Sequence, residues 1–226
     1  MNDFREALIR DLVADLRPVR RPGRTAHLLA MWLPILLLCN VAAIAVTGPF
    51  RDGALRSLYT FPAFAAETVI AAMAVALVVH ATLVSAIPRP RSPLRSLPWP
   101  ALIFGAWLGF YIVGFWSPAH PVSALGYRDH CLLETQLFGL LNLGVMLWIA
   151  RRLVPLWPRV TGALAGVAAA AIPAAIMQFA CMYVPEHILI YHIGPIAVTA
   201  IVGALIGPAA LVRRPVVPKR PGRAIP

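Results

Sequence analysis

Six long runs of apolar residues, each interrupted by a short polar or proline-rich segment, dominate the chain. They cover about residues 28–47, 63–87, 99–116, 131–150, 162–180 and 188–212. A run of about 20 apolar residues is long enough to cross the hydrocarbon core of a bilayer as a helix. The pattern therefore predicts an all-α integral membrane protein with six transmembrane helices and short loops. Because the third run is short and the second is long, we expect tilted helices.

Composition supports this interpretation. Of the 226 residues, 60% are hydrophobic and only 13% are charged, against roughly 25% charged in an ordinary soluble domain. The first apolar run is too long for the core of a signal peptide, and no small-residue cleavage site clearly follows it. We therefore expect no cleavable signal peptide, and little of the chain remains for a soluble catalytic domain.

The basic residues predict the orientation of the helices. Segments 1–27, 88–98, 151–161 and 213–226 hold 17 of the 20 lysines and arginines, and the alternate loops hold the other three, Arg51, Arg56 and Arg128. Short cytoplasmic loops carry the excess of basic residues. Both termini of a multi-pass protein of the bacterial inner (cytoplasmic) membrane are thus expected in the cytoplasm. The net charge of +11 indicates topology and contact with anionic lipid, and we expect no direct binding of nucleic acid.

This topology divides the chain into a cytoplasmic arm at 1–27, a membrane domain at 28–212 and a cytoplasmic basic tail at 213–226. In the arm, Phe4, Leu8, Leu12 and Leu16 recur every four residues, which predicts a short amphipathic helix. Three interpretations of this stripe stay open. The helix lies on the bilayer surface, docks on the protein's own helices, or enters a groove of a soluble partner. The interleaved acids weaken the first, since membrane-surface helices carry a cationic polar face.

Polar chemistry collects in the loops on the outward side, at about 48–62, 117–130 and 181–187. Cys131 and Cys181 each lie 25 residues from position 156, which is in the inner turn between the fourth and fifth helices. Two antiparallel neighbours joined by a short turn then place these cysteines at about the same height. The thiols could form a disulfide if their Cα atoms approach within about 7 Å, or they could share a soft metal with imidazoles. Further candidate ligands of a heavy-metal or divalent cation are His130, Glu134, Glu186, His187 and His192.

Plainer interpretations compete at several positions. A cysteine is often a small buried hydrophobe, which is what we expect of Cys39. His187 and Tyr191 are four residues apart and fit interfacial anchors at the level of the lipid head groups. His120 is flanked by prolines and fits a loop residue.

Three pairs of glycines at GxxxG spacing also stand in the apolar runs, and such pairs allow helices to approach closely. The approach can be within the bundle or between protomers, and we expect the pairs to pack inside the bundle. They are Gly105 with Gly109, Gly162 with Gly166, and Gly203 with Gly207.

Three segments carry a family resemblance: "LIRDLVADLRPVRRP", "CLLETQLFGLLNLGVMLWIARRLVPLWPRVTGALAG" and "CMYVPEHILIYHIGPIAVTAIVGALIG". Together they resemble the NrsF family of bacterial anti-sigma factors, in the same order of arm, spans and cysteines. The resemblance implies an inhibitor of an extracytoplasmic-function (ECF) sigma factor, held at the membrane and contacting sigma through the arm. It also implies that Cys131 and Cys181 sense heavy metals or oxidative stress. Many relatives have a "CPE"-like turn where this chain has "CMYVPEHILIYH", so the resemblance assigns no role to Glu186, His187 or His192.

Our prediction is therefore a non-enzymatic anti-sigma factor with no obligatory cofactor and no oligomeric state set by the sequence. The alternative is a small membrane permease or metal-handling protein. That function needs a polar path through the bilayer, for which the spans offer His80, Asn142, Gln178 and small residues. A thiol oxidoreductase is the weakest alternative, because the chain has no CxxC motif.

Overall fold

The computed structural model describes residues 2–14, 25–88 and 92–212. In that part of the chain every regular element is helical. The main helices are α1 (Asn2–Ala14), α2 (Thr25–Thr47), α3 (Ala54–Thr60), α4 (Pro62–Ala86), α5 (Pro98–Val113), α6 (Cys131–Leu153), α7 (Pro158–Ala180), α8 (Pro185–His187) and α9 (Gly194–Leu211). A 3₁₀ turn, Pro93–Ser96, precedes α5, and a π-helical turn, Ile188–Ile193, joins α8 to α9.

Five helical segments in the described residues are long and apolar enough to cross a membrane: His27–Thr47, Pro62–Ala86, Cys131–Leu153, Pro158–Ala180 and Pro185–Leu211. The expected third span forms only the 16 residues of α5, because Gly114–Trp116 leave the helix as a turn. All six predicted runs are thus helical, and five reach spanning length. Prolines help to set the helix starts, since Pro62, Pro98 and Pro158 occupy first-turn positions, where the missing N–H costs nothing.

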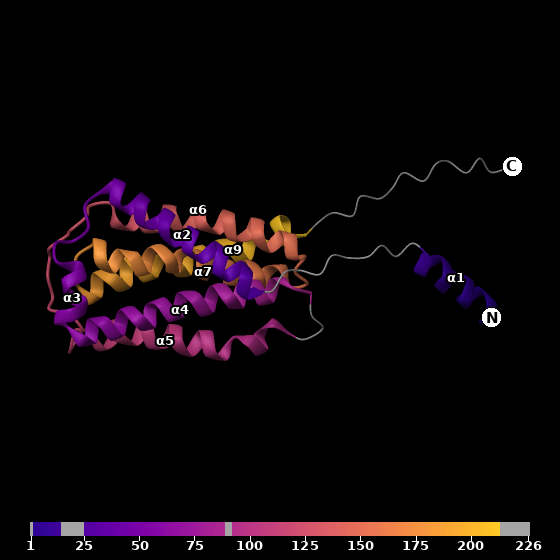
Figure 1. Cartoon of the computed structure of the whole chain (residues 1–226), viewed down its shortest axis with the longest axis horizontal. Helices are drawn as coiled ribbons and strands as arrows, with labels where there is room; N and C mark the ends of the chain where they lie inside the picture. The colour runs from indigo at the N-terminus through magenta and orange to yellow at the C-terminus, as the bar shows by residue number, and fades with distance from the viewer. Residues whose placement is uncertain (1, 15–24, 89–91, 213–226) are drawn as a thin grey trace.

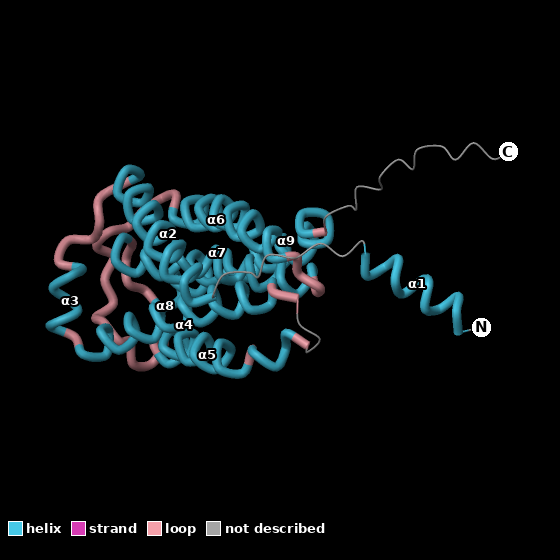
Figure 2. Tube along the Cα trace, turned by 45° about the vertical axis from the view of Figure 1, so that its right-hand side comes forward, coloured by secondary structure: helices cyan, strands magenta, loops and turns pink. Residues whose placement is uncertain are grey.

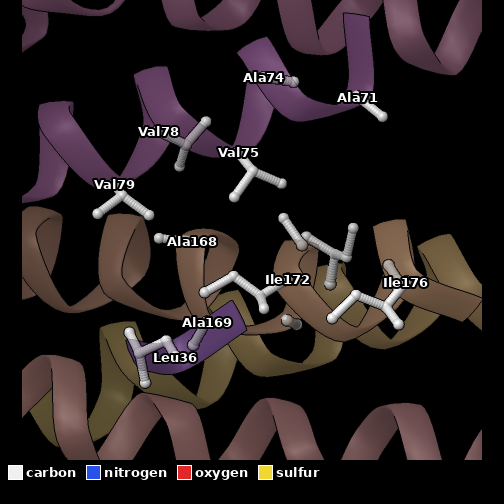
Figure 3. Packing of buried hydrophobic residues seen from close by; sticks show 14 of the residues in the cluster. Leu36, Ala71, Ala74, Val75, Val78, Val79, Ala168, Ala169, Ile172 and Ile176 are labelled. Atoms are coloured by element: carbon white, nitrogen blue, oxygen red, sulfur yellow. The ribbon is translucent and has the colours of Figure 1, made fainter. Parts of the chain in front are cut away.

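Helix α7 lies at the centre of the bundle and packs against α2, α4, α6 and α9, while α5 packs on the outer side of α4 (Figure 1). The face of α7 that points into the core is rich in alanine, which lets the neighbouring helices come close. Figure 3 shows Val75, Val78 and Val79 of α4 directed towards Ala168 and Ile172 of α7. These side chains form a dry apolar layer between the two helices.

The closest helix pair is α7 with α9. A Cβ atom added to Gly162 would collide with the carbonyl oxygen of Gly203, and one added to Gly166 would collide with the carbonyl oxygen of Thr199. We call Gly162, Gly166, Gly203 and Gly207 the glycine seam. The expected packing is confirmed for these two pairs. It is wrong for Gly105 and Gly109, because a Cβ at either position would meet no atom within 4 Å.

One end of the bundle is closed by α3 and three loops, at 48–53, 114–130 and 181–184 (Figures 1 and 2). We call it the α3 end. The backbone N–H of Arg51 donates to Phe179 O at 3.1 Å, and Ser123 and Tyr183 exchange two backbone hydrogen bonds of 3.1 Å. Arg128 forms an ion pair of 2.9 Å with Glu134 and donates to the carbonyl of Pro49. These bonds tie the loops to the ends of α2, α6 and α7.

Two expectations change for α2 and the arm. Cys39 is exposed on the surface of α2 and is not a buried hydrophobe, because the side of α2 that carries it faces away from the other helices. In α1, Phe4 is 77% exposed and Leu8 is 50% exposed, so their side chains do not dock on the protein's own helices. The side chain of Leu12, all of Leu16 and the basic tail at 213–226 fall outside the described residues.

The seam predicts a selective loss of stability. Gly162→Leu inserts a side chain where the α9 backbone already lies. We therefore expect the unfolding free energy in detergent to fall by about 1–3 kcal/mol or more. Gly105→Leu is the matched control, since that position opens onto empty space. Thermal unfolding followed by circular dichroism would measure both, and equal melting temperatures for the two variants would contradict the seam.

Candidate metal and thiol site

Four chemically reactive side chains meet at the α3 end from three different helices. Cys131 is the first residue of α6, and Cys181 follows the last residue of α7. His187 ends α8, and His192 lies in the π turn. All four are buried, and their ligand atoms lie within 4.8 Å of one another. We call this group the thiol–imidazole cluster.

The π turn is what brings the two histidines together. Each residue of an α-helix turns by about 100°, so residues five apart point about 140° away from each other. In a π turn the hydrogen bond spans five residues, and here the N–H of Gly194 donates to Leu189 O. His187 and His192 therefore share one side of the helix, with ring centroids 5.3 Å apart.

Pro195 gives a local reason for the π turn. It stands in the first turn of α9, where it has no N–H for the carbonyl of Tyr191, and its ring crowds that carbonyl. A wider turn relieves this crowding. The proline that favours the π turn thus also helps to position a histidine.

Each thiol in the cluster has an imidazole nitrogen within hydrogen-bond distance. Cys131 Sγ lies 3.0 Å from His192 Nε2, and Cys181 Sγ lies 3.3 Å from His187 Nε2. His187 is also held by its ring, which stacks on Tyr191 with centroids 4.6 Å apart. Neither thiol is part of a disulfide, and both are inaccessible to solvent.

The surroundings of Cys181 favour its thiolate. The hydrogen bond with Cys131 is the main influence that lowers the pKa of Cys181, and hydrogen bonds with His187 and His192 lower it further. Burial acts in the opposite direction, because it penalises the charged form. A thiolate is the form of cysteine that binds metal and attacks oxidants.

The donor set fits a tetrahedral soft-metal ion. Two thiolates and two imidazoles are a common zinc set, with Zn–S of about 2.3 Å and Zn–N of about 2.0–2.1 Å, which places bonded S and N atoms about 3.5 Å apart. The observed contacts of 3.0 and 3.3 Å would need to open by only a few tenths of an ångström. His192 also buries Nδ1 without a hydrogen-bond partner in the described residues. One ring nitrogen of His192 thus meets Cys131, and the other is left without a protein partner.

The structure does not bring the other three expected ligands into the cluster. Glu134 is taken by Arg128 in the ion pair. His130 is the exposed residue before α6, and Glu186 is exposed on α8. His187, in contrast, is only 8% exposed, so it is not an interfacial anchor at a lipid surface.

Beside the cluster lies a second buried polar group that the sequence did not reveal. Tyr183 donates a short hydrogen bond to Glu67, which is fully buried in α4. His120 lies in a loop as expected but is buried against the ring of Tyr183, with its Nε2 3.1 Å from Ser57 Oγ. Burial raises the pKa of Tyr183, with a further contribution from Glu67, and burial lowers the pKa of His120. The available sequence signal for this buried group was Glu67, a carboxylate one turn inside an apolar run.

Fold and site together define a helical membrane protein with a buried cluster of two cysteines and two histidines at one end of its bundle. The family model of NrsF, "Negative regulator of sigma F", matches residues 12–212, and the chain belongs to this family. Membership implies a negative regulator of a sigma factor and suggests a regulatory rather than a catalytic protein. No curated protein and no solved structure matches the chain.

We predict that the purified full-length chain binds one Cd²⁺ ion with the ultraviolet absorption of metal–thiolate bonds. Cys131→Ser or Cys181→Ser should abolish this band, and His192→Ala should weaken binding at least about tenfold, or 1.4 kcal/mol. Cys39→Ser is the thiol control, and His130→Ala is the imidazole control. An unchanged band in Cys181→Ser would exclude the cluster as the binding site.

Proposed function

We propose that this protein is an inner-membrane anti-sigma factor with both termini in the cytoplasm. In the resting state its arm holds an ECF sigma factor at the membrane. The thiol–imidazole cluster senses a heavy metal or an oxidant and causes the arm to release sigma. The observation that supports sensing most directly is the meeting of four buried donor atoms within 4.8 Å, from segments up to 61 residues apart in the chain.

The arm is suited to contact a soluble partner. In α1 the apolar side chains of Phe4, Leu8, Ile9 and Val13 are all at least half exposed. An amphipathic helix with an unpartnered apolar side is the form that enters a groove on another protein. The family match begins at residue 12, so for Phe4 and Leu8 the proposal rests on their exposure and spacing.

Two chemical events at the cluster would have different consequences. A metal ion would draw α6, the end of α7 and the π turn around one centre, with Cys131, Cys181, His187 and His192 as ligands. An oxidant such as hydrogen peroxide would join Sγ of Cys131 to Sγ of Cys181. The two thiols then lose two protons and two electrons, and the peroxide is reduced to two molecules of water.

Either event acts on α7 and α9 together. Cys181 follows α7, and His192 lies in the turn that leads into α9. Since the glycine seam joins the same two backbones at the opposite end of the bundle, a displacement at the cluster would move the pair as a unit. We propose that this motion is how the signal reaches the arm, which is a coupling between two distinct sites.

The arm proposal predicts a loss of sigma retention. In the full-length chain, Phe4→Ala with Leu8→Ala removes two exposed apolar side chains, and we expect the membrane-bound fraction of the sigma factor to fall at least tenfold. Glu6→Ala with Arg10→Ala is the matched control on the polar side of α1. Co-purification from membranes measures retention, and full retention by the Phe4–Leu8 variant would refute the arm contact.

The sensing proposal predicts that metal and oxidant can be separated by mutation. A Cys131→Ser, Cys181→Ser double variant should lose sigma release in response to both Cd²⁺ and peroxide. His192→Ala should lose only the metal response, because a disulfide needs no imidazole. A sigma-dependent reporter gene gives the readout, and Cys39→Ser is the control. Normal induction in the double variant would show that the signal is sensed elsewhere.

A further inference from the structure

Two neighbouring cavities at the α3 end share two arginines. The larger, about 690 Å³, lies between α2, α3, α4 and α7 and is lined mainly by apolar side chains, among them Leu37, Val75 and Ile176. We call it the tail cavity. The smaller, about 300 Å³, has a mixed lining in which Ser57 and Thr60 lie beside the apolar Phe61 and Leu125, and we call it the head cavity.

The residues common to both cavities are Arg51, Asp52, Gly53 and Arg56. An apolar chamber that meets a chamber of mixed lining at a pair of arginines has the layout of an amphiphile. Among the residues that line both cavities, the two arginines outnumber the single carboxylate. The charge of this shared lining favours an anion.

Arg51 is built into this junction without a protein partner. Its side chain is only 5% exposed, and Nη1 and Nη2 are both buried with no hydrogen bond in the described part of the chain. Its backbone is held by the bond to Phe179 O, and its guanidinium lies 5.8 Å from the ring centre of Phe64 and 5.9 Å from that of Tyr183. A buried cation that lacks hydrogen bonds is costly, and an anion in either cavity would remove that cost.

The nearest buried acid does not fill this role. Glu67 accepts the hydrogen bond of Tyr183 through Oε2, and its Oε1 has no hydrogen bond in the described residues. Among those residues, the ion pair within 4.0 Å is that of Arg128 with Glu134, and none joins Arg51 to Glu67. Glu67 therefore lies within electrostatic range of Arg51 but leaves its N–H donors without a partner.

We propose that the two cavities together bind one anionic phospholipid. One acyl chain occupies the tail cavity, and the phosphate lies at the junction on Arg51 and Arg56. The volume is in the range of sites for small ligands. Basic pockets between transmembrane helices bind anionic lipid head groups on the cytoplasmic side of membranes, and the α3 end offers the same chemistry on the opposite side. Ser57 and Thr60 can donate hydrogen bonds to the head group. A zwitterionic lipid is disfavoured, because its ammonium group would lie beside two arginines.

This site is distinct from the thiol–imidazole cluster and goes beyond regulation of sigma. None of the four cluster residues lines either cavity. Failure of the metal and oxidant proposals would therefore leave the lipid assignment unaffected, and failure of the lipid assignment would leave those proposals unaffected.

The test is native mass spectrometry of the full-length chain after exchange into mixed phosphatidylglycerol and phosphatidylcholine. We expect the phosphatidylglycerol adduct to exceed the phosphatidylcholine adduct at least fivefold. Arg51→Gln should abolish this preference, and Arg51→Lys should retain part of it. Arg159→Gln, an exposed arginine at the other end of α7, is the matched control and should leave it unchanged. Equal retention of the two lipids by the unmodified chain would overturn the proposal.

A second variant keeps the test decisive if Arg51→Gln fails to fold. Ala72→Trp fills the tail cavity from α4 without touching an arginine, and it should lower retention of phosphatidylglycerol at least fivefold. Unchanged retention in Ala72→Trp would refute the placement of the acyl chain. Competition with inorganic phosphate completes the design. Displacement of the lipid by phosphate at equal concentration would show a site for a free anion and overturn the lipid assignment.

Discussion

The pairing of α7 with α9 is the contact on which the thiol–imidazole cluster depends. At the glycine seam no side chain separates the start of α7 from the end of α9, and the cluster lies at the opposite ends of the same two helices, about 20–30 Å away along α7 at 1.5 Å per residue. Cys181 follows α7 and His192 precedes α9. A larger residue in the seam would separate the two backbones there, and the resulting change in their relative position would reach the cluster along the length of the helices.

Because lipid offers no hydrogen bonds, polar groups in the bundle bond to one another. Asn40 of α2 and Asn142 of α6 bond to each other, and Asn142 also donates to the carbonyl of Ala169 on α7. Gln178 donates to Thr68 in the same way. These pairs fix helix positions within the bundle. Asn142 and Gln178, two of the polar residues that suggested a transport path, thus join helices to one another, which agrees with a regulatory role.

The sequence predicted the helices well, because a run of apolar residues longer than about 18 has few folds open to it in a membrane. The meeting of Cys131 and Cys181 was also predictable, since two helices joined by a short turn return to the same height. The extent of α5 was not, because Gly114 ends the helix while the apolar run continues to Trp116.

The composition of the site was harder to predict than its place. Whether His187 and His192 share a side depends on a π turn, and the sequence pattern assumed a regular α-helix. Its spacing made Glu134 a candidate ligand, but Glu134 forms an ion pair with Arg128 of the preceding loop instead. Arg51 gave no signal as a site residue, because its burial comes from contacts with α4 and α7 that no local pattern contains.

The π turn also means that the last membrane segment carries one residue more than a regular α-helix of the same length. Such a surplus is what a single-residue insertion leaves behind when the helices on both sides keep their packing. Removal of one of residues 188–191 would restore a regular helix, and His187 and His192 would then be four residues apart, within about 40° of the same side. The two imidazoles would therefore remain neighbours, while the seam near the far end of α9 keeps its packing. The spacing of a ligand pair along the sequence can thus differ by one residue between two helices that present the same pair in space.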